Sequence, residues 1–425
     1  MYVVETTITI FMNINLRKFP TLIILFSITF LINQITLGSE VRGFDEKKLA
    51  RVGQKVQQLV DEKFIAGAVT LVARDGKIAH FKAHGVSDIN TGKKMEKDTI
   101  FRIYSMTKPI TTAAVMMLAE DKKISITDPV SKFLPEFENL LVFDESGNHK
   151  PAKKQITIID LMRHTSGLTY GFVGGDVAKI YKSKNVLDRN SSLKEMMKKV
   201  SQIPLEEEPG TVWRYSIAID VLGRLVEVVS GKSFRSFLKT EIFEPLGMKD
   251  TDFFVPKEKW NRFTNQNGRK RSGELFISES ASKSGYKRMP KNESGGGGLC
   301  STASDYFKFC QMILNGGEFN GKRLLKNETV SLMLTNHLPS SVKNIGINDN
   351  RKGIGFGYGF AVRFEESDWG SGGRKGECGW GGAASTHFWM LPKDGLVAIT
   401  LRNFMPYEWT LENELKPLIY QAMSD

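Results

Sequence analysis

Ser105 and Lys108 stand three residues apart, in a segment that could contain both a nucleophile and its activator. Residues with this spacing share one face of a helix, and the apolar residues 110–119 predict a helix directly after them. A serine hydroxyl is a weak nucleophile until an adjacent base takes its proton. An amine beside it, at the helix end where backbone N–H groups are unpaired, is a suitable partner. The pair therefore predicts nucleophilic catalysis by serine.

The same Ser-x-x-Lys spacing recurs elsewhere, so spacing alone does not identify the catalytic pair. The other five occurrences are Ser191/Lys194, Ser236/Lys239, Ser280/Lys283, Ser284/Lys287 and Ser340/Lys343. They lie in polar or charged surroundings, where a helix cap and a solvated lysine are the simpler interpretation. Only Ser105 follows an apolar segment and precedes a long apolar helix, which makes it the candidate nucleophile.

A serine hydrolase also needs a proton shuttle and an oxyanion hole. Tyr215 is the candidate shuttle, because a phenol near a lysine ammonium can exchange a proton with a hydroxyl. Taken alone, it could equally be a core tyrosine with a satisfied hydroxyl. The small residues 379–383 are the candidate oxyanion hole, because they let a backbone N–H approach a ligand closely. A bulge or a tight turn is the alternative there.

Other catalytic chemistries fit the sequence less well. His164 and His387 could suggest a Ser-His-Asp triad, but no Gly-x-Ser-x-Gly motif accompanies them. Three cysteines leave at least one thiol free and exclude a disulfide scaffold; they are Cys300, Cys310 and Cys378. Cys378 has no histidine near it in sequence and is not favoured as a nucleophile. No metal-ligand spacing is present, so we expect neither a metal nor a cofactor.

The composition is that of a soluble globular protein. The 425 residues, 41% hydrophobic and 25% charged, can bury a large core in one large or two smaller domains. The net charge of +12 is scattered rather than gathered with aromatic residues, so we expect no nucleic-acid partner. The basic excess indicates at most a general affinity for anionic surfaces.

The first forty residues differ from the rest of the chain. A basic pair at residues 17–18 precedes the apolar residues 21–32, and two small residues follow. This order predicts a signal peptide over residues 1–39, with Met12 a possible start, and a periplasmic or secreted protein. The alternative is an uncleaved membrane anchor over residues 20–38, since the apolar stretch nears the length of a short span.

Strand and helix patterns at the two ends predict one antiparallel sheet with flanking helices. The expected elements are a helix over residues 46–63, a hairpin over 66–86 turning at Asp75-Gly76, a strand over 356–364, a hairpin over 384–401 and a helix over 411–423. These assign residues 45–105 and 300–425 to an α/β part.

Residues 106–299 are expected to form a mostly helical part. Its helices include one that Thr157 caps and Gly167 ends, and one from Asp220 to Ser230. Just after this part, another helix is expected to start at residue 302. Residues 261–294 are polar and predict a long surface excursion. A cleft between the two parts would have Ser105 at its junction.

Several motifs in this order have a known counterpart. They are residues 105–108 (Ser-Met-Thr-Lys), 161–168 (Leu-Met-Arg-His-Thr-Ser-Gly-Leu), 215–231, 296–305 and 380–382 (Trp-Gly-Gly). Together they resemble the serine β-lactamase and penicillin-binding-protein superfamily, in the branch of class C β-lactamases, DD-peptidases and related esterases. The resemblance covers about residues 45–420 and implies the α/β (α+β) β-lactamase/transpeptidase-like fold.

The resemblance also implies roles for individual residues. Ser105 would be acylated, Lys108 would keep a proton in circulation, and Tyr215 would act as general base and then acid. The backbone N–H groups of Ser105 and Ala383 would bind the oxyanion, with Trp380, Gly381 and Gly382 lining the substrate strand. Water would then release the acyl group.

Two departures from the family pattern point to the substrate. The second motif often reads Tyr-x-Asn, but Ile217 stands at its third position and offers no amide. The third motif often begins with lysine or histidine, whose charge would recognise a carboxylate, but here it begins with Trp380. Both resemble the Trp-x-Gly esterases, so we expect an exported serine esterase that acts on uncharged small-molecule esters, or amides. A β-lactamase or DD-peptidase, and a non-catalytic envelope or penicillin-recognising protein, are the alternatives.

Overall fold

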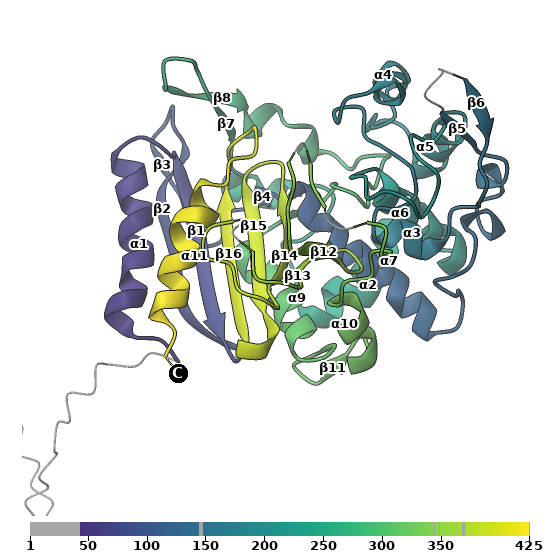
Figure 1. Cartoon of the computed structure of the whole chain (residues 1–425). Coiled ribbons are helices and arrows are strands. Elements are labelled where there is room, and N and C mark those ends of the chain that lie inside the picture. Colours follow the sequence, from purple (N-terminus) through teal and green to yellow (C-terminus); the bar gives the residue numbers. More distant parts are fainter. Residues whose placement is uncertain (1–42, 144–147, 343–344, 348, 368–369, 425) are drawn as a thin grey trace, which may run out of the picture. The chain divides into compact units, whose positions relative to one another are not determined.

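Eight strands form one antiparallel sheet (Figure 1). The computed structural model describes residues 43–424 except 144–147, 343–344, 348 and 368–369. The strands are β1 (Gly67–Arg74), β2 (Lys77–Asp88), β3 (Lys93–Lys94), β12 (Ile354–Phe356), β13 (Ala361–Arg363), β14 (Cys378–Gly382), β15 (Thr386–Leu391) and β16 (Leu396–Arg402). Their order is β12-β13-β14-β15-β16-β1-β2-β3. Because β1 pairs with β16, strands from both ends of the chain build the sheet, as the sequence predicted.

The predicted hairpins are present. β1 and β2 turn at Asp75 and Gly76, whose φ values of 50° and 75° are both left-handed. This turn needs positive φ at both central positions, and Asp-Gly is a pair of residues that can adopt it. β15 and β16 pair from Thr386↔Leu401 to Leu391↔Leu396.

The prediction of one strand over residues 356–364 is wrong. β12 ends at Phe356, β13 begins at Ala361, and the two strands pair with each other. Gly359 between them has φ 86°, and a Cβ there would lie 2.2 Å from the Thr112 side chain. The alternating pattern came from glycines that the turn requires, rather than from the pleat of one strand.

Two helices, α1 (Glu46–Asp61) and α11 (Thr410–Ala422), cover one face of the sheet (Figure 1). They share a core with the residues of β1, β15 and β16 that point toward them. In β15, Trp389 belongs to this core, whereas Phe388 and Met390 belong to the core on the opposite face. The side chains of β15 therefore alternate between the two faces, as a strand requires.

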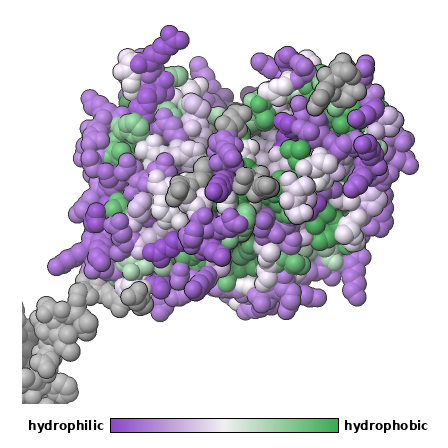
Figure 2. All heavy atoms as spheres, viewed as in Figure 1, coloured by the Kyte–Doolittle hydropathy of each residue, from purple (hydrophilic) through white to green (hydrophobic). Residues whose placement is uncertain are grey.

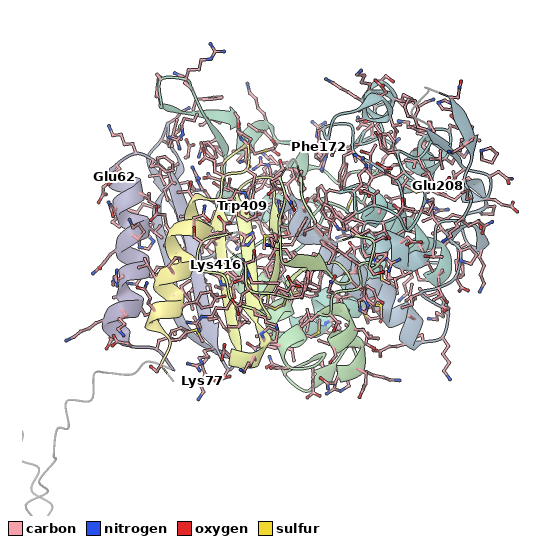
Figure 3. All side chains as sticks on the ribbon, viewed as in Figure 1. Glu62, Lys77, Phe172, Glu208, Trp409 and Lys416 are labelled. Carbon is pink, nitrogen blue, oxygen red and sulfur yellow. The ribbon has the colours of Figure 1, made fainter. Side chains whose placement is uncertain are left out.

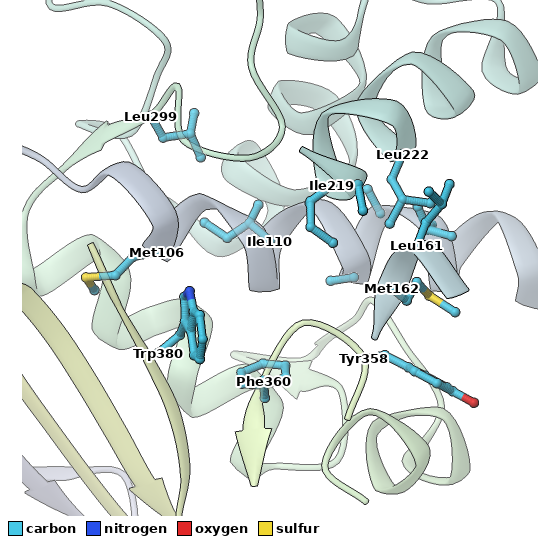
Figure 4. Close-up of a cluster of buried hydrophobic side chains, with 14 of the residues drawn as sticks. Met106, Ile110, Leu161, Met162, Ile219, Leu222, Leu299, Tyr358, Phe360 and Trp380 are labelled. Carbon is cyan, nitrogen blue, oxygen red and sulfur yellow. The ribbon is translucent and has the colours of Figure 1, made fainter. Parts of the chain in front are cut away.

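The opposite face packs against a larger helical assembly. Its helices are α2 (Thr107–Glu120), α3 (Ile158–Met162), α4 (Asp176–Ser183), α5 (Leu193–Val200), α6 (Ala218–Ser230), α7 (Phe234–Leu238), α8 (Glu244–Leu246), α9 (Ala303–Leu314) and α10 (Asn327–Met333). Eleven of the fourteen residues of α2 are buried, so this helix is central. Met106 and Ile110 lie near Trp380 of β14 in this core (Figure 4).

The predicted helix ends are mostly correct. Thr157 forms a capping box with Asp160 at the start of α3, Thr302 caps α9, and Gly231, with φ 70°, ends α6. The prediction that Gly167 ends the helix after Thr157 is wrong, because α3 stops at Met162.

Residues 261–294 are only in part a surface excursion. Thr264 and Asn267 are buried, and the Asn403 side chain donates to Thr264 Oγ1 at 2.7 Å. The segment contains the small hairpin β7 (Gln266–Arg269) and β8 (Leu275–Glu279). The other short pairs are β4 (Phe101–Arg102) with β9 (Cys300–Ser301), β5 (Leu141–Phe143) with β6 (His149–Pro151), and β10 (Glu318–Phe319) with β11 (Lys322–Arg323).

Hydrophilic residues predominate on the face that Figure 2 shows. Across residues 43–424, apart from the gaps given above, none of the helices combines the length and apolar character that a membrane span requires. The predicted signal peptide or anchor lies outside the described residues.

Candidate active site

A sharp turn presents Ser105 at the start of α2. The 3₁₀ turn Tyr104–Met106 follows β4 and leads directly into that helix. Tyr104 has φ 40°, a left-handed conformation that is uncommon outside glycine and that concentrates at functional sites. The Ile103 N–H donates to the Leu299 carbonyl at 3.0 Å, which fixes the approach to the turn. The backbone is thus bent at the residue before the candidate nucleophile.

Lys108 is fully buried, and its amine is held by three oxygens. Its Nζ donates to Ser105 Oγ at 3.1 Å, to the Tyr170 hydroxyl at 3.1 Å and to the Gly296 carbonyl at 2.7 Å. A lysine ammonium has three N–H donors, so each donor has an acceptor. The arrangement places a cation next to the serine hydroxyl without leaving a buried donor unpaired.

Tyr215 reaches the same serine from the helical side. Its hydroxyl donates to Ser105 Oγ at 2.6 Å, and Lys108 Nζ lies 4.6 Å from its ring centre. The ring of Trp213 stacks beside it at 6.2 Å, and that of Trp380 lies at 5.5 Å. The structure therefore brings together Ser105, Lys108 and Tyr215, which sequence analysis placed in one site.

Three further residues support Lys108, and sequence analysis did not identify them as site residues. The Tyr170 hydroxyl accepts from Lys108, and burial raises the pKa of that phenol well above its usual range. Asp220 accepts from the Gly296 N–H at 3.1 Å and from Ser294 Oγ at 2.5 Å. Burial raises the pKa of the Asp220 carboxyl, and the nearby Lys108 charge opposes that rise. Asp220 thereby positions the Gly296 carbonyl that holds the lysine.

Only weak sequence signals pointed to these supporting residues. Tyr170 follows the 161–168 motif by two positions, and Gly296 begins the 296–305 motif. Neither signal says that the side chain or carbonyl reaches Lys108.

The end of β14 lies against the serine turn. A Cβ at Gly382 would meet the Ile103 carbonyl at 2.1 Å, so only glycine allows this approach. Ala383 follows directly and lines the same cavity as Ser105. Gly381 and Trp380 line it too, which puts the whole predicted oxyanion segment beside the nucleophile.

The two histidines have other partners. His164 Nδ1 lies 3.2 Å from Ser216 Oγ, and its ring lies 5.1 Å from that of Tyr215. Burial lowers the pKa of His164 well below its usual range, so it is a neutral packing residue. His387 Nδ1 lies 3.1 Å from the Tyr407 hydroxyl, on the side of the sheet that faces α11. Neither histidine has a hydrogen bond to Ser105 among the described contacts.

A cavity of about 490 Å³ opens beside Ser105. Tyr215, Trp380 and Phe172 line it near the serine, and Phe172 is 64% exposed. Trp409, the residue before α11, and Lys416, within α11, also line the cavity; Figure 3 labels both side chains. A cavity of this size can enclose a small organic molecule.

Ile217, the first departure from the family pattern, does not line the cavity. It is fully buried in the core at the start of α6. Cys300, Cys310 and Cys378 are all free and buried. Among the described residues, no group of histidine, cysteine or acidic side chains could hold a metal ion.

The sequence profile of the Beta-lactamase family matches residues 52–417. The chain belongs to this family. It is 31% identical over 369 residues to Protein Rv1367c of Mycobacterium tuberculosis, across 83% of this chain and 89% of the relative. It is 28% identical over 371 residues to Esterase EstB of Burkholderia gladioli, across 83% and 90%.

A solved structure has the same fold. It is that of EstCE1, described as a hydrolase with promiscuous acyltransferase activity, with a TM-score of 0.77 and 27% identity over 88% of this chain and 99% of that one. The predicted fold class is confirmed, and this member of the Beta-lactamase family is a serine hydrolase.

Proposed function

We propose that this protein hydrolyses carboxylic esters of uncharged small molecules through an acyl-Ser105 intermediate. The observation that carries the proposal is that Tyr215 and Lys108 both lie within hydrogen-bond distance of Ser105 Oγ, in a cavity with an aromatic wall. The similarity to Esterase EstB and EstCE1 supports ester substrates.

The acylation step follows from the contacts. Tyr215 starts the reaction as a phenolate that has lost its proton to solvent and whose charge the neighbouring Lys108 ammonium offsets. Its oxygen takes the Ser105 proton as Oγ bonds to the ester carbonyl carbon, and Lys108 also offsets the charge that develops on Oγ. The backbone N–H groups of Ser105 and Ala383 bind the carbonyl oxygen while it is negative. When the carbon–oxygen bond to the alcohol breaks, Tyr215 returns the proton to the leaving oxygen.

In deacylation, water takes the place of the attacking Ser105 hydroxyl, and Ser105 Oγ becomes the leaving oxygen. Tyr215 takes a proton from water as the water oxygen attacks the acyl carbon. The bond to Ser105 Oγ then breaks, Oγ recovers the proton, and the carboxylic acid leaves. No co-reactant other than water is needed.

The position of Trp380 supports uncharged substrates. This side chain is 5% exposed and packs at 5.3 Å edge-on to Phe356, so its ring forms an apolar wall of the cavity. Where related enzymes carry a lysine, this wall offers no charge to a carboxylate.

Hydrolysis of β-lactams or D-Ala-D-Ala peptides is the second candidate. The Arg351 guanidinium lies 5.8 Å from the ring centre of Trp380. A positive charge therefore lies near position 380, where the family pattern often has a lysine. This guanidinium is already paired with Asp349 at 3.0 Å, which favours the ester proposal.

The test is hydrolysis of p-nitrophenyl acetate and butyrate by wild-type protein and Ser105→Ala. We expect the alanine variant to lose turnover, and a fluorophosphonate probe to add its mass only when Ser105 is present. Ser236→Ala is the matched control, since Ser236 has the same spacing to Lys239 but lies on α7 outside the cavity. Full activity in Ser105→Ala would contradict the proposal, and rapid nitrocefin hydrolysis with negligible ester turnover would select the second candidate.

We also propose that residues 1–39 direct export and are removed. The basic pair, the apolar stretch and the small residues support this proposal. N-terminal sequencing of protein from the extracytoplasmic fraction of the source cell tests it, and an intact N-terminus on membrane-bound protein would favour an anchor instead.

A further inference from the structure

Phe172 lies at the rim of the cavity that contains Ser105. Both residues line that cavity, and Figure 3 labels the Phe172 side chain. Of the large hydrophobic side chains in the described ranges, that of Phe172 is the most exposed, at 64%. A single exposed apolar residue is common on protein surfaces and carries no argument by itself. The position of Phe172 beside the nucleophile, and the contacts that fix it there, give its exposure a meaning.

A tight turn holds the backbone of Phe172. The Val173 N–H donates to the Tyr170 carbonyl at 3.2 Å, which closes a four-residue turn around Gly171 and Phe172. A Cβ on Gly171 would lie 3.1 Å from the Lys182 backbone nitrogen, so the turn packs closely against α4. Val173 packs against the main hydrophobic core. The Phe172 side chain is therefore exposed, but the backbone that carries it is anchored.

The ring of Tyr170 covers one face of the Phe172 ring. The two ring centres lie 4.6 Å apart with 20° between the ring planes, which is a stacked arrangement. Tyr170 is itself fixed, because it is 4% exposed and its hydroxyl accepts from Lys108 Nζ. No other ring in the described part of the chain contacts Phe172. Since one face is covered and most of the side chain is exposed, the opposite face of the Phe172 ring is open to a ligand.

These two rings belong to an aromatic wall that leads to the nucleophile. The Tyr170 ring lies 5.2 Å from that of Tyr215, whose hydroxyl donates to Ser105 Oγ at 2.6 Å. The Tyr215 ring in turn lies 5.5 Å from that of Trp380. Two ring spacings, of 4.6 Å and 5.2 Å, thus separate Phe172 from Tyr215. An ester bound at Ser105 can span this separation with a short carbon chain.

We propose that Phe172 is a specificity-determining residue that selects esters carrying an aromatic group. The open face of the Phe172 ring packs against a flat ring of the substrate, while the ester carbonyl carbon lies at Ser105. Aromatic pairs gain stabilisation beyond the apolar area that they bury, because a ring has a negative face and a positive edge. This subsite rests on the proposed esterase function and extends it to a substrate class.

Matched ester pairs test the subsite. A cyclohexyl group is about as large as a phenyl group but lacks its flat, polarised face. In the acyl arm, ethyl 5-phenylpentanoate is compared with ethyl 5-cyclohexylpentanoate; in the alcohol arm, 3-phenylpropyl acetate is compared with 3-cyclohexylpropyl acetate. The quantity measured is the ratio of kcat/KM, phenyl to cyclohexyl. Because the two groups also differ in hydrophobicity, the informative result is the change in this ratio when Phe172 is replaced.

Variants show whether Phe172 causes the preference. Phe172→Leu keeps an apolar side chain but removes the aromatic face, and we expect the ratio to fall about twofold to tenfold in at least one arm. That arm identifies which part of the ester lies on Phe172. Phe172→Trp, which keeps an aromatic face, should retain the ratio. Each ratio is measured on one preparation, so the fraction of folded enzyme cancels.

Tyr170→Phe separates the stacking from the support of Lys108. This variant keeps the ring that covers Phe172 but loses the hydroxyl that accepts from Lys108. We expect kcat to fall for both esters of a pair, whereas the ratio should stay at the wild-type value. A ratio that fell as far in Tyr170→Phe as in Phe172→Leu would show that the preference comes from the lysine network, which would contradict the proposal.

Phe276→Leu is the matched control. Phe276, on β8, is also an exposed phenylalanine, but it does not line the cavity, so the ratio should not change. Equal ratios in wild-type protein and Phe172→Leu in both arms would overturn the subsite while the esterase function stood. Failure of the wild-type protein to hydrolyse any ester, p-nitrophenyl acetate included, would instead contradict the proposed function, and the subsite with it.

Discussion

Lys108 donates a 2.7 Å hydrogen bond to the carbonyl of Gly296, a residue 188 positions further along the chain. Asp220 holds the N–H of the same glycine, so one residue connects a buried carboxyl with the amine beside the nucleophile. The position has no room for a side chain. A Cβ on Gly296 would lie 2.3 Å from Asp220 Oδ2 and 2.9 Å from the Tyr170 hydroxyl.

Gly296→Ala should therefore displace the carbonyl that holds Lys108. We expect a loss of about 1–3 kcal/mol in the free energy of unfolding, because overpacking a tight site forces its neighbours to move. We also expect a clear fall in kcat for p-nitrophenyl esters. Denaturant unfolding and steady-state kinetics measure the two effects. Gly273→Ala is the control, because its Cβ would meet nothing within 4 Å, although its φ of 89° adds strain of its own. Unchanged kcat in Gly296→Ala would contradict the role of this carbonyl.

Tyr215→Phe should remove the proton shuttle while keeping the ring that packs against Trp380 and Trp213. General acid–base groups contribute about 10²–10⁴-fold, so we expect kcat for p-nitrophenyl butyrate to fall within that range. The melting temperature should change little. Tyr170→Phe also loses a hydroxyl next to Lys108, but that hydroxyl has no hydrogen bond to Ser105 among the described contacts, so its effect should be smaller. A larger fall in kcat in Tyr170→Phe than in Tyr215→Phe would show that Tyr170 is the proton shuttle.

Trp380→Lys would introduce a charge that can recognise a carboxylate, but we expect it to lower both stability and ester turnover. The new ammonium would be placed against Tyr215 and Phe356 at a position that is 5% exposed. Burying a charge without a partner is costly, so we expect a lower melting temperature and a lower kcat/KM for neutral esters. Trp380→Phe keeps the apolar wall, so its melting temperature and its kcat/KM for neutral esters should stay close to those of the wild-type protein. A Trp380→Lys variant with improved ester turnover would contradict the view that the indole forms the substrate wall.

Glu412 should make stability depend on pH. Burial raises the pKa of its carboxyl from 4.5 to about 7, against the opposing effects of the Tyr407 hydrogen bond and the Lys416 charge. The folded protein thus binds this proton more tightly than the unfolded chain does. The contribution of this proton to the free energy of unfolding is fully present below pH 4.5 and is lost as the pH rises to about 7. The free energy of unfolding changes by about 3 kcal/mol over this range.

Glu412→Gln isolates this contribution, because the amide does not titrate. We expect the difference in unfolding free energy, wild type minus variant, to fall between pH 4.5 and 7.5 in urea titrations. A difference that stays constant over this range would show that Glu412 titrates alike in the folded and unfolded protein.

The three thiols should be inert in the folded protein. Burial raises the pKa of Cys300 to about 12 and that of Cys310 well above its usual range. Since the thiolate is the reactive form, iodoacetamide at pH 8 should label no cysteine until a denaturant is added, as intact mass will show. Rapid labelling of the native protein with loss of ester hydrolysis would indicate that a thiol takes part in the site.

Local chemistry in the sequence determined much of the fold. Asp75-Gly76 specified a turn, Thr157 and Asp160 specified a helix start, and the spacing of Ser105 and Lys108 put both at the start of one helix, with Ser105 in the 3₁₀ turn that leads into α2 and Lys108 in the first turn of α2. These features depend on residues that are close together in the chain, so a local pattern is sufficient to predict them. The glycines at 357 and 359 misled the strand prediction, because the contacts that leave no room for a side chain there come from distant parts of the chain: the Met333 carbonyl lies against Gly357 and the Thr112 side chain against Gly359.

The tertiary structure alone decided which distant groups meet. Lys108 contacts Tyr170 and Gly296, and residues of β14 and α11 line one cavity together with Ser105. No local pattern encodes these contacts, because they depend on how the sheet and the helices pack around buried polar groups. The sequence named a nucleophile and its activator, and the packing determined what holds the amine in place and how far a substrate can extend.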